Sequence, residues 1–186
     1  VLTDLFDVPA TSPVSFAKLR LGWAQVGSDT DPFRLADPFF LGTPVGNNAT
    51  AAPSNTLPNF DLKPELQTSY EIGADVRLFN DRIGVDLTYY NTISENQILA
   101  IDLPESTGKT SRIINAGKIQ NRGVEVLLNA TPVKTSTGLS WNTIFNFSLN
   151  RNQVLELPAG VDQYIYGGNG VTLVAQEGGA LGDMWG

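Results

Sequence analysis

A long alternation of apolar and polar residues is the feature that most constrains this fold. In the segment SYEIGADVRLFNDRIGVDLTYYNT, from Ser69 to Thr92, nearly every second residue is apolar. The alternation breaks only at FNDR, where a turn can reverse the chain. The opposite face carries charged residues, namely Glu71, Asp75, Arg77 and Asp86. A period of two over this distance predicts a long hairpin with one apolar face.

The same alternation recurs along the chain, whereas the helical signal is limited to one turn at VLTDLF. The pattern predicts five strands and a less regular sixth. Their expected ranges are Ser15 to Val26, Gln67 to Phe79, Arg82 to Thr92 with an extension toward Leu99, Asn121 to Ala130, Leu139 to Asn150 and Val171 to Gln176. The first five have about 10 to 13 residues, against five or six in most soluble sheets. A tilted strand needs about nine to eleven residues to cross a bilayer, so these lengths favour lipid as the solvent.

The predicted connections alternate between short and long. If Leu78 faces Ile83, Asn80 and Asp81 form a two-residue turn in which both residues tolerate a positive φ. The link TPVKTSTG is also short, while the other connections are much longer. In an up-and-down meander this alternation places every long loop at one end of the sheet. Transmembrane β-barrels show that asymmetry.

Composition excludes several classes of function. The net charge is -7, with 19 acidic and 12 basic residues, which argues against a nucleic-acid partner. Cys and His are both absent from the sequence, so disulfide scaffolds, Ser-His-Asp triads and imidazole metal ligands are excluded. No apolar run is long enough for a transmembrane helix. The first residues do not resemble a signal peptide, so we expect a mature chain or an internal piece of a longer one.

Two acidic residues are the candidates for chemistry. The predicted register sets Asp75 opposite Asp86, an unfavourable pair unless Arg77 reaches between them. Two carboxylates at a set distance could hydrolyse a glycosidic bond. On an alternating wall, however, lining a lumen or contacting a plug is the favoured role for them.

The loops supply the remaining candidates. Tyr164 and Tyr166, in QYIYGGNG, could stack on the sugar rings of a substrate, or could simply end a strand beside a turn. Asp29 and Asp31 could begin an oxygen-rich calcium site, although the Gly and Glu of an EF-hand are missing at the required spacing. A loop with local caps is therefore the favoured interpretation of that segment.

Several segments resemble the SusC/RagA-like TonB-dependent outer-membrane transporters. These segments are FAKLRLGWAQVG, DLKPELQTSYEIGADVRLFNDRIGVDLTYYNTISENQIL, INAGKIQNRGVEVLLNATPV, LSWNTIFNFSLNRNQVLEL and QEGGALGDMWG. They occur in the expected order over almost the whole chain, and residues 1–14 and the loop from Ser28 to Phe60 match least. The resemblance implies an all-β fold, an antiparallel up-and-down meander that forms part of a 22-stranded transmembrane β-barrel with long loops on one side.

The resemblance also implies a function. It predicts part of an active transporter in the bacterial outer membrane, typical of Bacteroidota, that imports large nutrients such as oligosaccharides or peptides. The implied partners are outer-membrane lipid, the TonB-ExbB-ExbD complex, acting through parts not present here, and a SusD-like surface lipoprotein. Neither a catalytic residue nor a cofactor nor a metal is expected. The candidate substrate-facing loops are Ser28 to Asp61, Ile98 to Arg112 and Glu156 to Thr172.

Residues 1–186 are expected to be a partial barrel domain. Five or six strands cannot close a barrel, and no plug or TonB box is visible in the sequence. We expect such a piece to be insoluble or to require detergent, because lipid does not tolerate unpaired strand edges.

Two other functions stay open at this point. The first is a secreted β-sandwich that binds carbohydrate or mediates adhesion, in which a second sheet would cover the apolar face. The second is a β-rich glycosidase. Aromatic residues do not decide between these functions, because they could form an interfacial girdle or could simply be common in strands.

Overall fold

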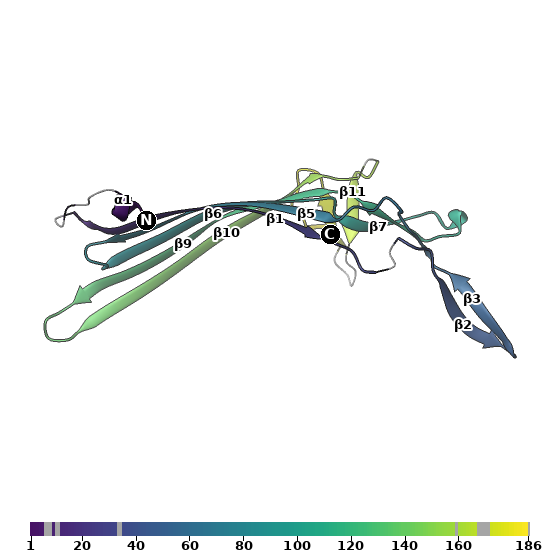
Figure 1. The fold of residues 1–186 in the computed structure, drawn as a ribbon, viewed down its shortest axis with the longest axis horizontal. Coiled ribbons are helices and arrows are strands. Elements are labelled where there is room, and N and C mark those ends of the chain that lie inside the picture. Colours follow the sequence, from purple (N-terminus) through teal and green to yellow (C-terminus); the bar gives the residue numbers. More distant parts are fainter. Residues whose placement is uncertain (6–8, 10–11, 33–34, 159, 167–171, 186) are drawn as a thin grey trace. The chain divides into compact units, whose positions relative to one another are not determined.

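The computed structural model describes the chain except residues 6–8, 10–11, 33–34, 159, 167–171 and 186. The fold is all-β, as predicted from the alternation (Figure 1). The one helical turn expected near the start is α1 (Leu2–Leu5), and η1 (Glu105–Thr107) is a short 3-10 turn. Within the described residues, no helix is long and apolar enough to span a membrane.

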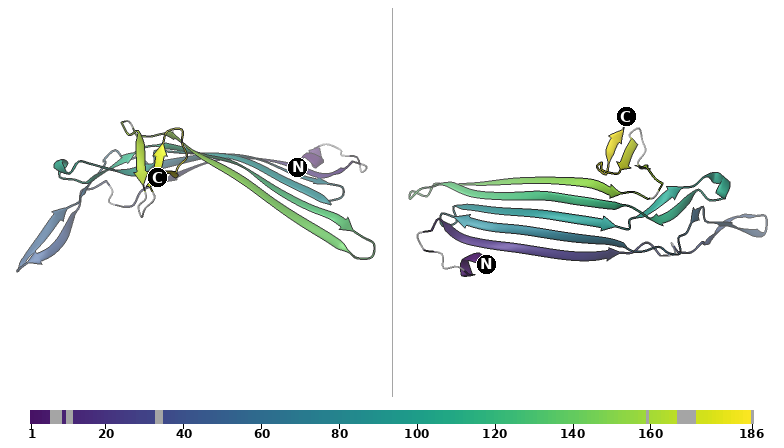
Figure 2. Two further views of the ribbon diagram at one scale, coloured as in Figure 1. Left: turned by 180° about the vertical axis from the view of Figure 1, so that it is seen from behind. Right: turned by 90° about the horizontal axis from the view of Figure 1, so that it is seen from above.

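Five long strands lie side by side in one sheet (Figure 2). In sheet order they are β1 (Val14–Ser28), β5 (Glu65–Leu78), β6 (Ile83–Glu95), β9 (Lys118–Lys134) and β10 (Ser140–Glu156). Sheet order follows chain order among these strands, which confirms the predicted antiparallel meander. The strands have 13 to 17 residues and are thus longer than expected. The excess arises because the strands continue beyond the apolar stretch that the pattern detects.

The two short connections are tight turns. Asn80 and Asp81 both have positive φ, at 53° and 62°, and the Arg82 N–H donates to the Phe79 carbonyl at 3.3 Å. The turn therefore lies where the sequence predicted it, but the positive φ values begin one residue earlier, at Phe79 (55°). Between β9 and β10 the chain reverses around Gly138, whose φ is 95°. Glycine fits that position because a side chain is rarely tolerated in this backbone region.

The long connections contain strands of their own. β2 (Phe39–Val45) and β3 (Asn48–Pro53) form a hairpin. β8 (Ser111–Asn115) pairs with β7 (Ile98–Asp102) in antiparallel and with β4 (Thr56–Leu57) in parallel. β12 (Thr172–Gln176) lies between β11 (Gln163–Tyr166) and β13 (Asp183–Trp185). The expected sixth strand is thus β12, but it belongs to this small sheet instead of the meander.

The chain divides into two compact units. The strand unit comprises Val1–Gln25, Thr68–Ile93 and Gln120–Gln153, and contains both short turns. The loop unit comprises Val26–Gln67, Ser94–Ile119 and Val154–Gly186, and contains every long connection between the five meander strands. The predicted separation of long loops from short turns is therefore confirmed.

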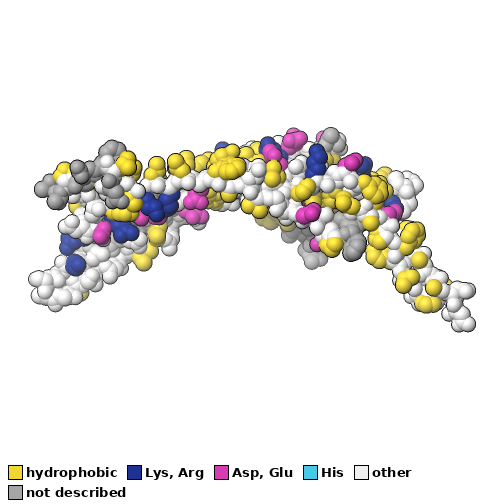
Figure 3. Space-filling model, in the orientation of Figure 1, with side chains coloured by type: hydrophobic (Ala, Val, Ile, Leu, Met, Phe, Trp, Pro, Cys, Tyr) yellow, Lys and Arg dark blue, Asp and Glu magenta, His cyan; other side chains and the backbone are white. Residues whose placement is uncertain are grey.

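The two units differ in whether they have a buried core. Among the described residues, the buried hydrophobic side chains all belong to the loop unit: Ile113, Ala116, Ile119, Val154, Leu157, Val174 and Ala175. In the strand unit, Leu21 is 73%, Trp23 63% and Trp141 61% exposed. Hydrophobic side chains accordingly gather on the surface along the strands (Figure 3). Within the strand unit, the described residues form one sheet, so this unit supplies no second sheet of its own to cover the apolar face.

Candidate functional site

On the polar face of the strand unit, side chains hydrogen-bond to one another across neighbouring strands. The Ser69 and Thr92 hydroxyl oxygens lie 3.0 Å apart, and the Thr131 hydroxyl donates to Asn142 Oδ1 at 2.9 Å. Both pairs lie on the polar phase of their strands. This face therefore satisfies part of its hydrogen bonding without water.

Arg20 of β1 reaches across β5 to bind Asp86 of β6. Its terminal nitrogens donate to the two carboxylate oxygens of Asp86 at 2.9 and 2.6 Å, and one nitrogen also donates to the Thr88 hydroxyl at 3.1 Å. Such bidentate pairs are among the more directional polar contacts in proteins. β5 can be crossed because residue 73 is glycine, where a Cβ would lie 2.8 Å from an Arg20 nitrogen.

In the same way, the Tyr90 side chain of β6 reaches across β9 to β10. Its hydroxyl donates to Asn150 Oδ1 on β10 at 3.2 Å. A Cβ at Gly123 of β9 would lie 2.5 Å from that hydroxyl oxygen and 2.5 Å from the Leu149 carbonyl oxygen. Gly73 and Gly123, the bridged glycines, are the only buried residues in the described part of the strand unit. Each is covered by a side chain that connects its two neighbouring strands.

The two carboxylates of the predicted pair have different partners. Both oxygens of Asp86 accept hydrogen bonds from Arg20. Arg77 lies 3.8 Å from Asp75 and 4.9 Å from the centre of the Phe16 ring. The sequence left open whether Arg77 relieves the repulsion between the two acids; in the structure Arg77 lies beside Asp75, and Arg20 supplies the positive charge at Asp86. The sequence signal that could have revealed this is a glycine on the polar phase of the strand between them.

At one end of the apolar face of the strand unit, the apolar residues give way to hydrogen-bonded pairs of polar side chains. Gln25 donates to the Thr68 hydroxyl at 3.2 Å, and Gln120 donates to Asn91 Oδ1 at 2.7 Å. All four residues lie on the apolar phase of their strands. The aromatic residues Trp23, Tyr70 and Tyr89 each stand two positions inside this limit. An amphipathic ring just inside a polar boundary is the arrangement expected at a membrane interface.

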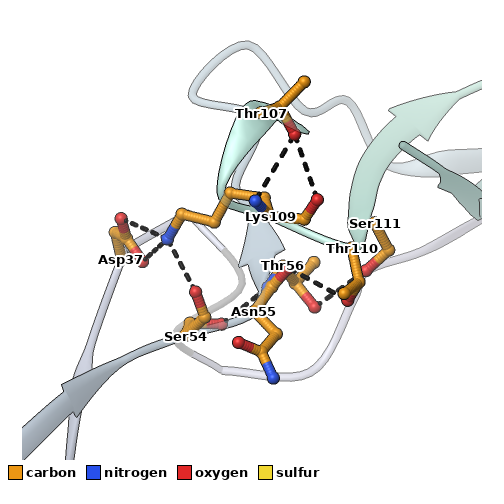
Figure 4. Close-up of polar contacts among 8 residues, drawn as sticks. All are labelled: Asp37, Ser54, Asn55, Thr56, Thr107, Lys109, Thr110 and Ser111. Atoms are coloured by element: carbon orange, nitrogen blue, oxygen red, sulfur yellow. Dashed lines mark hydrogen bonds and ion pairs between the residues drawn. The ribbon is translucent and has the colours of Figure 1, made fainter. Parts of the chain in front are cut away.

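In the loop unit, Lys109 fastens two of the candidate substrate-facing loops together (Figure 4). Its Nζ donates to the Asp37 carboxylate at 2.8 and 2.9 Å and to the Ser54 carbonyl at 2.7 Å. Beside it, the Thr56 and Ser111 hydroxyl oxygens lie 3.0 Å apart where β4 pairs with β8. These contacts join Ser28–Asp61 to Ile98–Arg112, so the two loops form one folded body.

A second set of contacts fixes the bases of the same loops. The Asn115 side chain accepts from the Lys63 N–H at 2.6 Å and donates to the carbonyls of Lys63 and Asn96 at 2.7 and 2.9 Å. Glu65 accepts from the Ile98 N–H at 2.9 Å. The loop unit is therefore ordered by side chains that replace missing backbone pairing.

The candidate calcium ligands lie in a polar pocket of the loop unit. Asp29, Asp31 and Glu65 line a space of about 250 Å³. Asp29 accepts a local hydrogen bond from the N–H of its neighbour Thr30 at 2.8 Å. Within the described residues, no group of three or more acidic, His or Cys side chains is arranged to hold a metal ion.

Tyr164 packs against the core of the loop unit. Its ring contacts the cluster of Val154, Leu157 and Ala175, and its hydroxyl donates to the Ala100 carbonyl at 3.3 Å. The same ring lines an apolar pocket of about 250 Å³. The side chain of Tyr166 lies outside the described residues. A role for either tyrosine in substrate binding stays a prediction.

Comparison with known proteins identifies relatives over nearly the whole chain. A family profile described as TonB dependent receptor-like, beta-barrel matches residues 10–181. The TonB-dependent receptor P39 of Formosa agariphila is 32% identical over 177 residues, which cover 93% of this chain and 16% of P39. TonB-dependent receptor P3 of the same organism is 35% identical over 133 residues, covering 69% of this chain and 13% of P3.

Two further similarities extend to SusC and to a solved structure. TonB-dependent receptor SusC of Bacteroides thetaiotaomicron is 26% identical over 161 residues, covering 82% of this chain and 16% of SusC. The structure of the RagAB peptide transporter superposes with a TM-score of 0.81 at 20% identity, over 95% of this chain and 19% of that chain. At that identity, the superposition bears on the fold alone. The chain spans 13% to 16% of the length of these curated relatives.

Proposed function

The chain belongs to the TonB-dependent receptor β-barrel family, whose members are outer-membrane proteins, and from this premise we propose that it forms barrel wall and outer loops of a SusC-type nutrient importer. We propose that residues 1–186 are a partial domain of a 22-stranded barrel. β1 and β10 are the outer strands of the described sheet, so both would pair with further strands in a closed barrel.

The observation that carries this proposal is that the strand unit exposes its large apolar side chains. Most of its exposed large apolar side chains lie on one face, while side chains on the opposite, polar face hydrogen-bond to one another. In water, this apolar face would be a severe aggregation risk. In a bilayer the same face contacts acyl chains, and the polar face lines the lumen.

The proposed partners follow from the family. The TonB-ExbB-ExbD complex would supply energy through parts of the receptor outside this chain, and a SusD-like lipoprotein would cap the loops. Large nutrients, either oligosaccharides or peptides, would be the substrates. Relatives named as TonB-dependent receptors and SusC support this assignment. We propose no catalytic role.

The proposed substrate-facing region is the loop unit. It contains the three loops predicted from the sequence, Ser28 to Asp61, Ile98 to Arg112 and Glu156 to Thr172. Tyr164 and Tyr166 remain the proposed aromatic contacts. Lys109 supports the idea indirectly, because it holds two of these loops in a fixed arrangement.

Single-cysteine labelling tests the proposal, because the sequence contains no Cys. In the intact receptor, freed of any other cysteines, Leu41→Cys should react in whole cells with a membrane-impermeant maleimide. Leu87→Cys, on the apolar face of β6, should stay protected from it even after permeabilisation. Equal labelling of the two positions would show that the apolar face meets water, and the transporter assignment would then fail.

A further inference from the structure

The apolar pocket beside Tyr164 has the character of a binding site. It encloses about 250 Å³ in the loop unit. Its apolar lining comes from separate segments of the chain and includes Leu99, Ile119, Val154, Leu157, Tyr164 and Leu181. Three of these residues, Ile119, Val154 and Leu157, are buried. The pocket is therefore lined in part by core residues of the unit and in part by exposed ones, Glu156 and Leu181.

Hydrogen bonds hold the walls of the pocket in place. The Val154 N–H donates to the Gly179 carbonyl at 2.9 Å, and the Gly178 N–H donates to the Val154 carbonyl at 2.8 Å. The Leu157 N–H donates to the Glu177 carboxylate at 2.9 Å. The Tyr164 hydroxyl donates to the Ala100 carbonyl, which fixes its ring at the pocket wall. A pocket formed in advance costs little ordering when a ligand enters.

The chemistry of the lining selects against a sugar. Gln97 and Glu156 are the charged or amide side chains that line the pocket, and the Tyr164 hydroxyl already donates to a carbonyl. Most hydroxyl groups of a pyranose would therefore lose water without gaining a partner, which is unfavourable. An apolar group has no hydrogen bonds to water to lose when it enters the pocket. An engineered cavity of about 150 Å³ already binds benzene, so this pocket can hold a phenyl ring or a branched aliphatic group.

We propose that this pocket binds one apolar side chain, of leucine or phenylalanine size, on an imported peptide. The inference rests on the proposed transport function and deepens it by favouring peptides over oligosaccharides as the molecules that the loops contact. The loop Glu156 to Thr172, predicted from the sequence to face the substrate, supplies Glu156, Leu157 and Tyr164 to the pocket. Tyr164 would then contact an apolar side chain and not a sugar ring.

Photolabelling of the intact receptor in lipid nanodiscs tests the proposal. The probe is the tripeptide Ala-photoleucine-Ala, whose diazirine side chain is leucine-sized. After irradiation, mass spectrometry should locate the adducts on pocket residues such as Leu157, Tyr164 or Leu181. An excess of Ala-Leu-Ala should reduce the labelling at least tenfold, whereas Ala-Ser-Ala and maltotriose should not. Competition by maltotriose as strong as by Ala-Leu-Ala would overturn the proposal in favour of a saccharide site.

Matched variants separate a specific site from adhesion to any apolar surface. Leu181→Asp puts a charge at the pocket through a residue exposed enough to accept it, and labelling should fall at least tenfold. Met184→Asp changes an exposed residue of β13 that does not line the pocket, and labelling should be unchanged. Equal labelling of both variants would overturn the pocket proposal. If Leu87→Cys is still protected in that receptor, the transport proposal survives that result.

Discussion

The two units of this chain handle apolar residues differently. The loop unit has a small buried core, with Ile113 only 2% exposed, although it also exposes apolar side chains such as Leu41 at 87%. The strand unit displays them and, among its described residues, buries only the bridged glycines, Gly73 and Gly123. The exposed apolar face of the strand unit therefore suits a lipid medium, whereas the core of the loop unit forms from its own side chains. In the strand unit, cohesion depends on the backbone ladder and on side chains that cross the polar face.

The largest expected effect comes from making a cavity in the core of the loop unit, which the strand unit lacks. Ile113→Ala should lower the free energy of local unfolding by about 2–5 kcal/mol, because it removes a buried side chain from a packed site. In the intact receptor, hydrogen exchange should accelerate in β7 and β8 and stay unchanged in β6. The control is Leu41→Ala, a residue that is 87% exposed, which should have no such effect. Equal acceleration in both variants would mean that the loop unit has no core of its own.

A charge on the apolar face tests the strand unit in its proposed medium. Leu87→Arg should cost about 2–4 kcal/mol of folding free energy in phospholipid vesicles, because arginine near the bilayer midplane is poorly solvated. Leu41→Arg in the loop unit should be nearly neutral in the same vesicles. Denaturant titration of the intact receptor measures both variants. If Leu87→Arg is tolerated as well as Leu41→Arg, the contrast between the two units disappears.

The bridged glycines allow a sharper test within the strand unit alone. Gly73→Ala should destabilise the receptor by about 1–3 kcal/mol, since its methyl group would displace the Arg20 guanidinium. Gly84→Ala on the same face is the matched control, because its Cβ meets nothing closer than Asn129 at 3.9 Å. Adding Arg20→Ala should abolish most of the additional cost of Gly73→Ala. A cost that persists in that background would show that Gly73 serves another purpose.

Gly123→Ala should behave differently from Gly73→Ala. Its Cβ would meet the Leu149 carbonyl oxygen as well as the Tyr90 hydroxyl, each at 2.5 Å. A backbone oxygen cannot move aside without disturbing the strand pairing. Tyr90→Ala should therefore recover only part of the lost stability, measured by the same denaturant titration. Full recovery would mean that the β10 backbone adjusts freely at this point.

Much of the strand unit could be predicted from the sequence because a period of two is a local signal. The alternation located the five meander strands, and Asn80-Asp81 located a turn by local chemistry. The Arg20–Asp86 contact could not be found in this way, because its partners lie two strands apart. Alternation assigns Arg20 to a face but does not indicate which side chain it meets there.

Apart from β12, the strands of the loop unit were not predicted, for a different reason. β2 and β3 contain Gly42, Pro44 and Pro53, which interrupt any strand pattern. β4 has two residues and exists because it pairs with β8, a distant segment. The buried cluster likewise joins Val154 and Leu157 to Ala175 across a long connection. Tertiary contacts create these elements, and a local pattern carries no information about them.

The smallest expected effect concerns the contact that unites two loops. Lys109→Met keeps most of the aliphatic stem but removes the bonds to Asp37 and Ser54, which should cost about 1 kcal/mol because one partner is exposed. Limited proteolysis of intact cells should then cleave the segment from residue 35 to 58 several-fold faster. Lys134→Met, an exposed lysine at the end of β9, should leave the cleavage rate unchanged. Identical cleavage rates in the two variants would show that the Lys109 contacts are not needed to hold the two loops together. The small sheets of the loop unit would then be sufficient to order them.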